Sequence, residues 1–125
     1  MNKKSFIFTA IFLVLAVIIA AWFFIFKKPE KSGVSQLDVF AQCLSEKGAE
    51  MYGADWCPYC QNEKKAFGDA FRFISYIECP DNPKQCLAAG ITGYPTWLFP
   101  DGKRFEGEQG LQNLSKESGC SLPEQ

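Results

Sequence analysis

The chain has 125 residues, which suffices for one small domain. From Gln36 onward it carries 8 basic and 13 acidic side chains, and this net charge of −5 argues against nucleic acid or an anionic lipid surface as the main partner. The chain has no histidine, which excludes hydrolases that depend on a Cys-His pair.

The first predicted element is a membrane-spanning helix. Residues 5–26 form 22 consecutive positions without a charged side chain, or about 33 Å of helix. This stretch is too long for the core of a signal peptide and lacks a small-residue cleavage pattern. A buried core helix is disfavoured, because so small a domain could not cover it on all sides. We expect a cytoplasmic tail at 1–4, a transmembrane anchor at 5–26 and a polar linker at 27–35.

The orientation of this anchor depends on the cysteines rather than on the flanking charges. Lys3 and Lys4 precede the span, and Lys27, Lys28 and Lys31 follow it. The numbers of positive charges on the two sides are therefore nearly equal, and the positive-inside rule does not decide the orientation. All six cysteines follow the span, and this number suits an oxidising compartment. We expect a single-pass protein whose domain lies on the extracytoplasmic side, in a periplasm, a lumen or at a cell surface.

The domain at 36–125 alternates helical and strand patterns. Ser35 and Asp38 form a capping-box-like start, and Gly48 is suited to end the first helix. The later predicted elements are a strand at 49–53, a helix at 58–71, a strand at 73–78, a short helix at 83–90, a hairpin at 96–106 and a last helix at 111–118. This order predicts an α/β fold with two consecutive βαβ crossovers and a mixed sheet. The loop after the first strand would then lie at the carboxyl edge of a central strand.

The segment Trp56-Cys57-Pro58-Tyr59-Cys60 places two thiols one helical turn apart. Cys57 would begin the second helix, where unpaired backbone N–H groups and the helix dipole favour a thiolate. Pro58 fits the first helical turn. We therefore predict that Cys57 is an exposed nucleophile and that Cys60 is a shielded thiol that resolves mixed disulfides. Trp56 and Tyr59 form an apolar rim suited to protein docking.

Two other interpretations of these cysteines are weaker. A permanent disulfide between Cys57 and Cys60 would close a loop too short to restrict the unfolded chain much. A zinc site would require Cys79 and Cys86 as further ligands, but six residues separate that pair instead of two to four.

These motifs, with Gly93-Tyr94-Pro95-Thr96-Trp97 and Asp101-Gly102-Lys103 downstream, resemble the pattern of the thioredoxin superfamily. More narrowly, the chain resembles the thioredoxin-like domain associated with bacterial vitamin K epoxide reductase homologues. That likeness covers roughly residues 36–119 and rests on three segments: Met51-Tyr52-Gly53-Ala54, the Cys79 and Cys86 pair, and Tyr94-Pro95-Thr96-Trp97. The resemblance implies a thioredoxin-like fold, with a central mixed four-stranded sheet flanked by helices.

The resemblance also implies roles for individual residues. The Tyr94-Pro95 peptide would be cis, with Pro95 against the dithiol and the Tyr94 backbone pairing with a substrate strand. Cys79 and Cys86 would form a disulfide like the pair in the narrower family, for which a structural role is favoured over a second redox relay beside the active site. The pairing of Cys43 with Cys120 remains open, because two unpaired thiols fit the sequence equally well.

One position departs from the superfamily pattern. Thioredoxins usually have a buried Asp six positions before the first cysteine, where it assists proton transfer to and from the second cysteine, and here that position is Met51. Glu78 or Glu50 could substitute, although both are expected at the surface. Proton handling would otherwise fall to water or to a partner.

The sequence therefore predicts a membrane-anchored thiol–disulfide oxidoreductase that acts on extracytoplasmic proteins with no cofactor or metal beyond its own dithiol. The expected redox partner is a separate, quinone-linked integral membrane protein of the vitamin K epoxide reductase type. Two alternatives are a non-catalytic thioredoxin-like binding module with a fixed disulfide, and a glutaredoxin-like reductase, since Cys-Pro-Tyr-Cys is the usual glutaredoxin motif. Whether the chain oxidises or reduces its substrates depends on its reduction potential.

Overall fold

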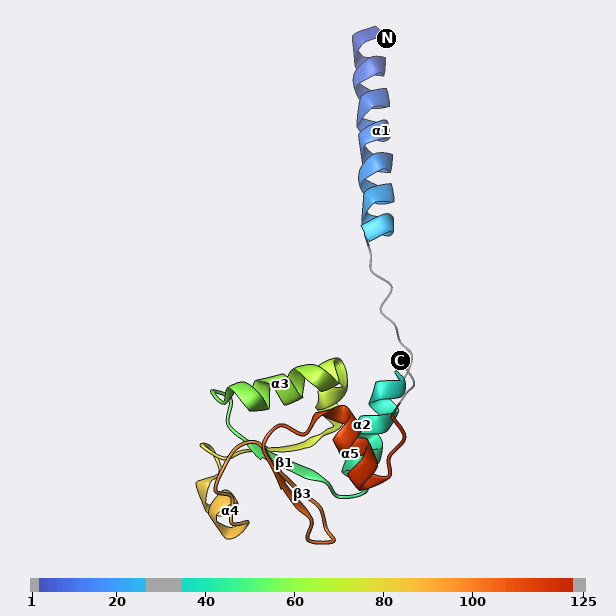
Figure 1. Cartoon of the computed structure of the whole chain (residues 1–125). Helices are drawn as coiled ribbons and strands as arrows, with labels where there is room; N and C mark the ends of the chain where they lie inside the picture. Colours follow the sequence, from blue (N-terminus) through green and yellow to red (C-terminus); the bar gives the residue numbers. More distant parts are fainter. Residues whose placement is uncertain (1–2, 27–34, 123–125) are drawn as a thin grey trace. The chain divides into compact units, whose positions relative to one another are not determined.

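The computed structural model describes residues 3–26 and 35–122. The chain falls into two units, Met1–Gly33 and Val34–Gln125, which we consider separately (Figure 1). Residues 1–2 of the predicted tail and 27–34 of the predicted linker lie outside the described residues.

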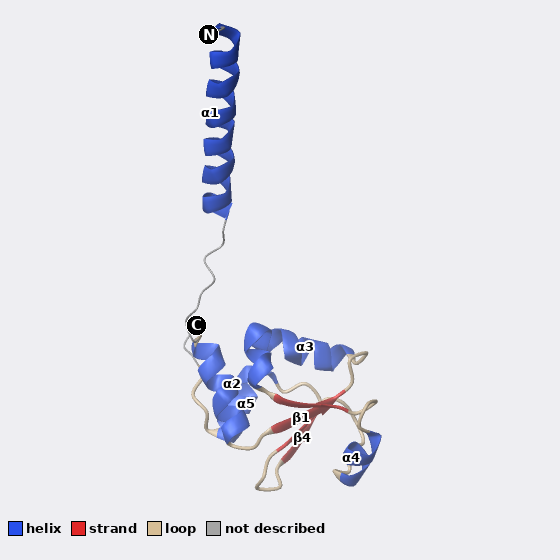
Figure 2. Cartoon of the chain, turned by 180° about the vertical axis from the view of Figure 1, so that it is seen from behind, coloured by secondary structure: helices blue, strands red, loops and turns tan. Residues whose placement is uncertain are grey.

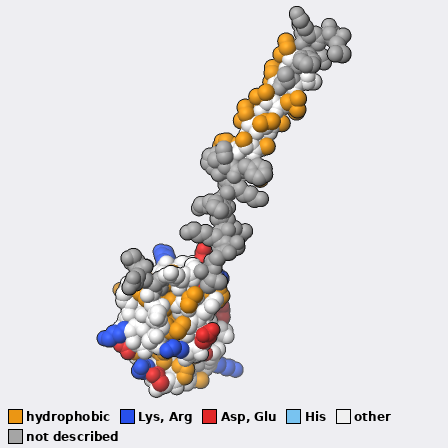
Figure 3. Space-filling view, turned by 90° about the vertical axis from the view of Figure 1, so that its right-hand side faces the viewer, with side chains coloured by type: hydrophobic (Ala, Val, Ile, Leu, Met, Phe, Trp, Pro, Cys, Tyr) orange, Lys and Arg blue, Asp and Glu red, His pale blue; other side chains and the backbone are white. Residues whose placement is uncertain are grey.

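The first unit contains helix α1 (Lys3–Phe26), which includes the whole predicted segment 5–26. Large apolar side chains are exposed along it, as the orange atoms of Figure 3 show, and they include Phe8, Phe12 and Phe23. Among the residues that the structure describes, no helix meets the length and apolarity needed to cross a membrane. The structure confirms that the segment 5–26 is helical. That this helix spans a membrane stays a prediction.

The second unit begins with helix α2 (Gln36–Glu46), and the capping box predicted there is present. Ser35 Oγ accepts the N–H of Asp38 at 3.0 Å, and the Asp38 carboxylate accepts the N–H of Ser35 at 3.2 Å. These two bonds satisfy backbone donors that the first helical turn leaves unpaired. Gly48 follows the helix with φ of 73°, a conformation that glycine adopts without strain.

The sheet is mixed, as predicted, and has the order β2-β1-β3-β4. Its strands are β1 (Glu50–Gly53), β2 (Ser75–Glu78), β3 (Thr96–Leu98) and β4 (Arg104–Glu106). β1 and β2 are parallel, whereas β3 runs antiparallel to both β1 and β4. The second predicted βαβ crossover is therefore wrong, because residue patterns mark a strand but not its direction.

The strands are connected by α3 (Pro58–Phe67), the 3₁₀ segment η1 (Gly68–Phe73) and α4 (Pro83–Ala88), and α5 (Gly110–Ser118) follows the last strand. The helix predicted at 58–71 ends at Phe67 because Gly68 adopts φ of 55°, and the chain continues as the tighter η1. α2, α3 and α5 lie on one face of the sheet, and α4 lies on the other (Figure 2).

Side chains alternate between these two faces along each strand. Met51 and Tyr76 contribute to the large core under α2, α3 and α5, and the aromatic rings of Phe40, Phe67 and Trp97 lie at its centre. The intervening Tyr52 and Ile77, with Leu98, contribute to the smaller core under α4. Alternate residues along each strand therefore face opposite cores, and only one of these two sets packs in the core that contains Cys57 and Cys60.

Candidate active site

The dithiol lies where the sequence predicts, at the junction of a central strand and a helix. β1 ends at Gly53, and Cys57 is the N-cap of α3, with Pro58 as the first helical residue. The extended backbone of Cys57 lets its sulfur accept the N–H of Cys60 at 3.2 Å. A negative charge on Cys57 would thus be stabilised by a backbone donor and by the end of the helix dipole.

Both cysteines of this pair are free thiols. The thiol of Cys60 donates a hydrogen bond to the sulfur of Cys57, and the two sulfurs are 2.6 Å apart. Cys60 is fully buried, as predicted, but Cys57 is only 4% exposed and so is less accessible than expected. The reason is the capping geometry, because the Cys57 sulfur turns inward to accept the amide of Cys60.

The thiol of Cys60 holds its proton tightly. Burial, together with the hydrogen bond to Cys57, raises the pKa of Cys60 to about 12. Cys60 therefore keeps its proton at neutral pH. It can act as a nucleophile only if that proton leaves during the reaction.

An aromatic rim surrounds the dithiol. Trp56 and Tyr59 are 69% and 61% exposed, and the ring of Trp56 meets the edge of Tyr94 with centroids 5.9 Å apart. An open depression of about 550 Å³ is lined by Tyr59, Tyr94 and residues 107–110. The structure thus brings predicted docking residues together from two separate parts of the chain and adds residues 107–110, which the sequence analysis did not identify.

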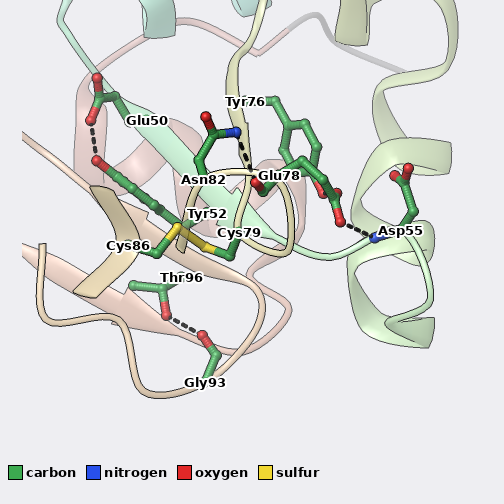
Figure 4. The surroundings of a disulfide bond; sticks show 10 residues. All are labelled: Glu50, Tyr52, Asp55, Tyr76, Glu78, Cys79, Asn82, Cys86, Gly93 and Thr96. Carbon is green, nitrogen blue, oxygen red and sulfur yellow. Dashed lines mark hydrogen bonds between the residues drawn. A yellow bond between two sulfur atoms is a disulfide. The ribbon is translucent and has the colours of Figure 1, made fainter. Parts of the chain in front are cut away.

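The segment that carries Tyr94 adopts the backbone that the resemblance implies. The Tyr94-Pro95 peptide is cis, and Pro95 is buried. The carbonyl of Pro95 accepts the N–H of Gly107 at 2.7 Å, and Thr96 Oγ1 donates to the carbonyl of Gly93 at 2.8 Å (Figure 4). The position of Pro95 directly against the dithiol stays a prediction.

The other four cysteines form two disulfides. Cys79 is bonded to Cys86, with an S–S distance of 2.00 Å (Figure 4), and Cys43 is bonded to Cys120. The second bond joins α2 to the segment after α5, which resolves the pairing that the sequence left open. The alternative zinc site lacks its ligands, because Cys79 and Cys86 are bonded to each other.

Comparisons with known proteins find relatives that are named for thiol–disulfide chemistry. No family model matches the chain. It is 41% identical over 91 residues to Thiol-disulfide oxidoreductase LTO1 from Arabidopsis thaliana, which covers 66% of this chain and 24% of that protein. It is 32% identical over 87 residues to Protein disulfide isomerase-like 2-2 from Oryza sativa subsp. japonica, covering 57% of this chain and 23% of that protein.

The chain has a thioredoxin-like α/β fold. It spans about a quarter of the length of these two relatives, and their names support a disulfide oxidoreductase activity. The narrower link to vitamin K epoxide reductase homologues is not shown by these comparisons, so it remains a proposal.

Sequence reasoning missed one buried carboxylate in this thioredoxin-like domain. Glu63 on α3 is fully buried, and it accepts the N–H groups of Gln109 at 2.7 Å and of Gly110 at 3.0 Å. Burial raises the pKa of Glu63, whereas these two bonds lower it. The side chain holds the loop that lines the depression. Its spacing from Cys60 and Phe67, on one helical face, is the signal that could have revealed it.

The superfamily's buried Asp is indeed absent from this thioredoxin-like site, because Met51 fills that position and is fully buried. Glu50 and Glu78, expected at the surface, are both half-buried and paired with tyrosines. Tyr52 donates to Glu50 at 2.7 Å, and Tyr76 donates to Glu78 (Figure 4).

Proposed function

We propose that this chain is a membrane-anchored thiol–disulfide oxidoreductase that exchanges disulfides with cysteine-containing extracytoplasmic proteins. The observation that carries the proposal is the geometry of Cys57 and Cys60. One sulfur caps a helix, and its partner thiol, 2.6 Å away, is buried and protonated. A binding module with a fixed disulfide is less well supported, because the relatives of this chain are named as a thiol-disulfide oxidoreductase and a protein disulfide isomerase-like protein.

The exchange proceeds in two steps. The Cys57 thiolate attacks a substrate disulfide, forms a mixed disulfide and releases one substrate sulfur. Cys60 then loses its proton and attacks the Cys57 sulfur, so that the Cys57–Cys60 disulfide forms and the second substrate sulfur leaves. The substrate gains two electrons and the dithiol loses two. The same steps in reverse oxidise a substrate dithiol, and the reduction potential of the pair decides the direction.

The aromatic rim supplies the docking surface in this proposal. An extended substrate segment would lie along the depression between Tyr59 and Tyr94, with Trp56 beside it. Such a site gains affinity from aromatic contact and tolerates varied sequences, because main-chain hydrogen bonds carry much of the recognition.

Membrane attachment through α1 is the second part of the proposal. The 22 uncharged residues at 5–26 and the exposed apolar side chains of α1 support it. The Cys43–Cys120 and Cys79–Cys86 disulfides support an oxidising compartment. The nine residues of the linker at 27–35 reach at most about 30 Å, which suits exchange with a quinone-linked membrane protein of the vitamin K epoxide reductase type.

A thiol-trapping assay tests the exchange reaction. The full-length protein in detergent is mixed with a disulfide-containing substrate protein, and the products are analysed by intact mass. The wild type should release reduced substrate and become oxidised at Cys57 and Cys60. A wild-type protein that neither reduces nor oxidises any substrate over a range of thiol buffers would exclude the proposed function.

A further inference from the structure

A tyrosine lies near the buried thiol of Cys60, on the same face of the sheet, and its hydroxyl is hydrogen-bonded to a carboxylate. A Cβ atom added to Gly53 would lie 3.0 Å from Cys60 Sγ and 3.2 Å from Tyr76 Oη. The Cys60 sulfur and the Tyr76 hydroxyl therefore both approach Gly53, the residue of β1 that has no side chain. The Tyr76 hydroxyl in turn donates a hydrogen bond to the Glu78 carboxylate (Figure 4).

This arrangement matters because Cys60 has a proton to lose and no water-exposed surface through which to lose it. The Cys60 side chain is fully buried, and burial raises its pKa to about 12. Met51, which occupies the position of the superfamily's acid, has no group that accepts or donates a proton in this reaction. Glu78, in contrast, is a half-buried residue whose carboxylate can take up a proton.

Hydrogen bonds and charged neighbours fix the position of Glu78 beside Tyr76. The titratable groups that face Cys60 and Tyr76 are Cys57, Asp55, Lys64 and Glu78. Lys64 Nζ lies 3.9 Å from the centroid of the Tyr76 ring and 2.7 Å from Asp55 Oδ1. The N–H of Asp55 donates to Glu78 Oε1 at 3.0 Å. Glu78 is thus held in place by one hydrogen bond from the backbone of Asp55 and one from the hydroxyl of Tyr76.

We infer that Glu78, acting through the hydroxyl of Tyr76, accepts the proton of Cys60 when Cys60 resolves the mixed disulfide, and returns it in the reverse reaction. This inference rests on the proposed function. The S–H bond of Cys60 breaks, its proton passes to Tyr76 Oη, and the Tyr76 proton passes to Glu78. The Cys57–Cys60 bond forms with the electron pair of the Cys60 sulfur, and the substrate leaves as a thiolate. Glu78 then gives its proton to water.

The chain contains a matched control for this pair. Tyr52 and Glu50 make the same tyrosine–carboxylate hydrogen bond, at 2.7 Å, two residues apart on the neighbouring strand. Tyr52 belongs to the opposite face of the sheet, in the cluster with Cys79 and Cys86 (Figure 4). Tyr52→Phe and Glu50→Gln therefore remove equivalent groups without touching the dithiol core.

Stopped-flow reaction of the reduced full-length protein with an aromatic disulfide, dithiobis(nitrobenzoate), separates the two steps. The first release of coloured thiol depends on reagent concentration and reports attack by Cys57. The second is independent of reagent concentration and reports resolution by Cys60. Glu78→Gln is informative because its amide oxygen can still accept the N–H of Asp55, whereas the amide takes up no proton.

In Tyr76→Phe and Glu78→Gln, we expect the second phase to slow by roughly tenfold or more near neutral pH, as for loss of a positioned acid or base. Its rate should then rise in proportion to hydroxide, and the first phase should match the wild type. Tyr52→Phe and Glu50→Gln should leave both phases unchanged. A second phase at the wild-type rate and pH profile in both relay variants would overturn the inference, and so would equal slowing of both phases. Failure of the proposed function is distinguishable, because the wild type would then show no first phase.

Discussion

The sulfur of Cys57 receives two hydrogen bonds from Cys60, one from its thiol at 2.6 Å and one from its backbone N–H at 3.2 Å. A single residue therefore stabilises a thiolate at Cys57 and supplies the nucleophile for the next step. The two cysteines differ in role because one lies at the helix end and the other lies one turn inside it.

The first prediction is that Cys57 alone traps substrates. Cys60→Ser should accumulate a mixed disulfide at Cys57, because no thiol is left to resolve it. Cys57→Ser should accumulate none, since the remaining Cys60 thiol is buried and protonated. Non-reducing gels and intact mass provide the measurement. Equal trapping by both variants would show that the two roles are wrongly assigned.

The second prediction concerns pH and stability. The pKa of Cys60 is raised from an ordinary value of 9.0 to about 12, so between these values the unfolded chain releases this proton and the folded chain keeps it. The contribution of Cys60 to the free energy of unfolding is therefore fully present below pH about 9 and is lost as the pH rises toward about 12.

Thermal unfolding of the reduced protein as pH is raised above about 9 measures this effect. Reduced wild type should lose stability with rising pH more steeply than Cys60→Ser, in which the titrating group is gone. Identical slopes for the two proteins would mean that Cys60 is not held protonated by burial.

The third prediction concerns the buried carboxylate of Glu63. Glu63→Ala should lower the free energy of unfolding by about 1–3 kcal/mol, because the N–H groups of Gln109 and Gly110 lose their acceptors. Glu63→Gln should cost less, since its amide oxygen still accepts a hydrogen bond. Urea unfolding is the measurement, and the exposed Glu108→Gln serves as the control. If Glu63→Ala is as stable as this control, the Glu63 carboxylate does not stabilise the fold.

The fourth prediction uses the space beside Gly53. Gly53→Ala places a methyl group 3.0 Å from Cys60 Sγ and 3.1 Å from the Tyr76 ring, and relieving this contact should cost about 1–3 kcal/mol of stability. Gly93→Ala, whose Cβ meets no atom within 4 Å, should change stability by less than about 0.5 kcal/mol. If the two substitutions are equally tolerated in urea unfolding, Cys60 and Tyr76 do not converge at Gly53.

Membrane attachment gives the fifth prediction. Protease added to intact cells, after any outer barrier has been opened, should digest the domain at 36–125 while a cytoplasmic marker survives. The reason is the uncharged segment at 5–26 together with the disulfide-rich domain that follows it. Protection of the domain in this assay would place it in the cytoplasm.

Local signals in the sequence predicted the parts of this structure that depend on neighbouring residues. The capping box of Ser35 and Asp38 and the position of Cys57 at a helix start both follow from short-range backbone geometry. The direction of β3 and the bond between Cys43 and Cys120 depend on contacts between distant segments, so no local pattern determined them.

In the functional site, too, the sequence predicted features carried by local motifs but not those that depend on contacts between distant segments. The sequence identified the dithiol and its aromatic rim, because each is carried by a motif. It did not reveal that Glu63 is buried or that Tyr76 and Cys60 meet at Gly53. Both facts depend on which face of the sheet a residue joins, and that is decided by packing across the whole domain.

A redox titration of the full-length protein tests the central claim most directly. The protein is equilibrated in thiol buffers of graded potential, free thiols are alkylated, and each cysteine is quantified by peptide mass. We predict one two-electron transition in which Cys57 and Cys60 pass together from thiols to a disulfide, while Cys43–Cys120 and Cys79–Cys86 stay oxidised. A Cys57–Cys60 pair that remains in one state throughout the range would contradict the account.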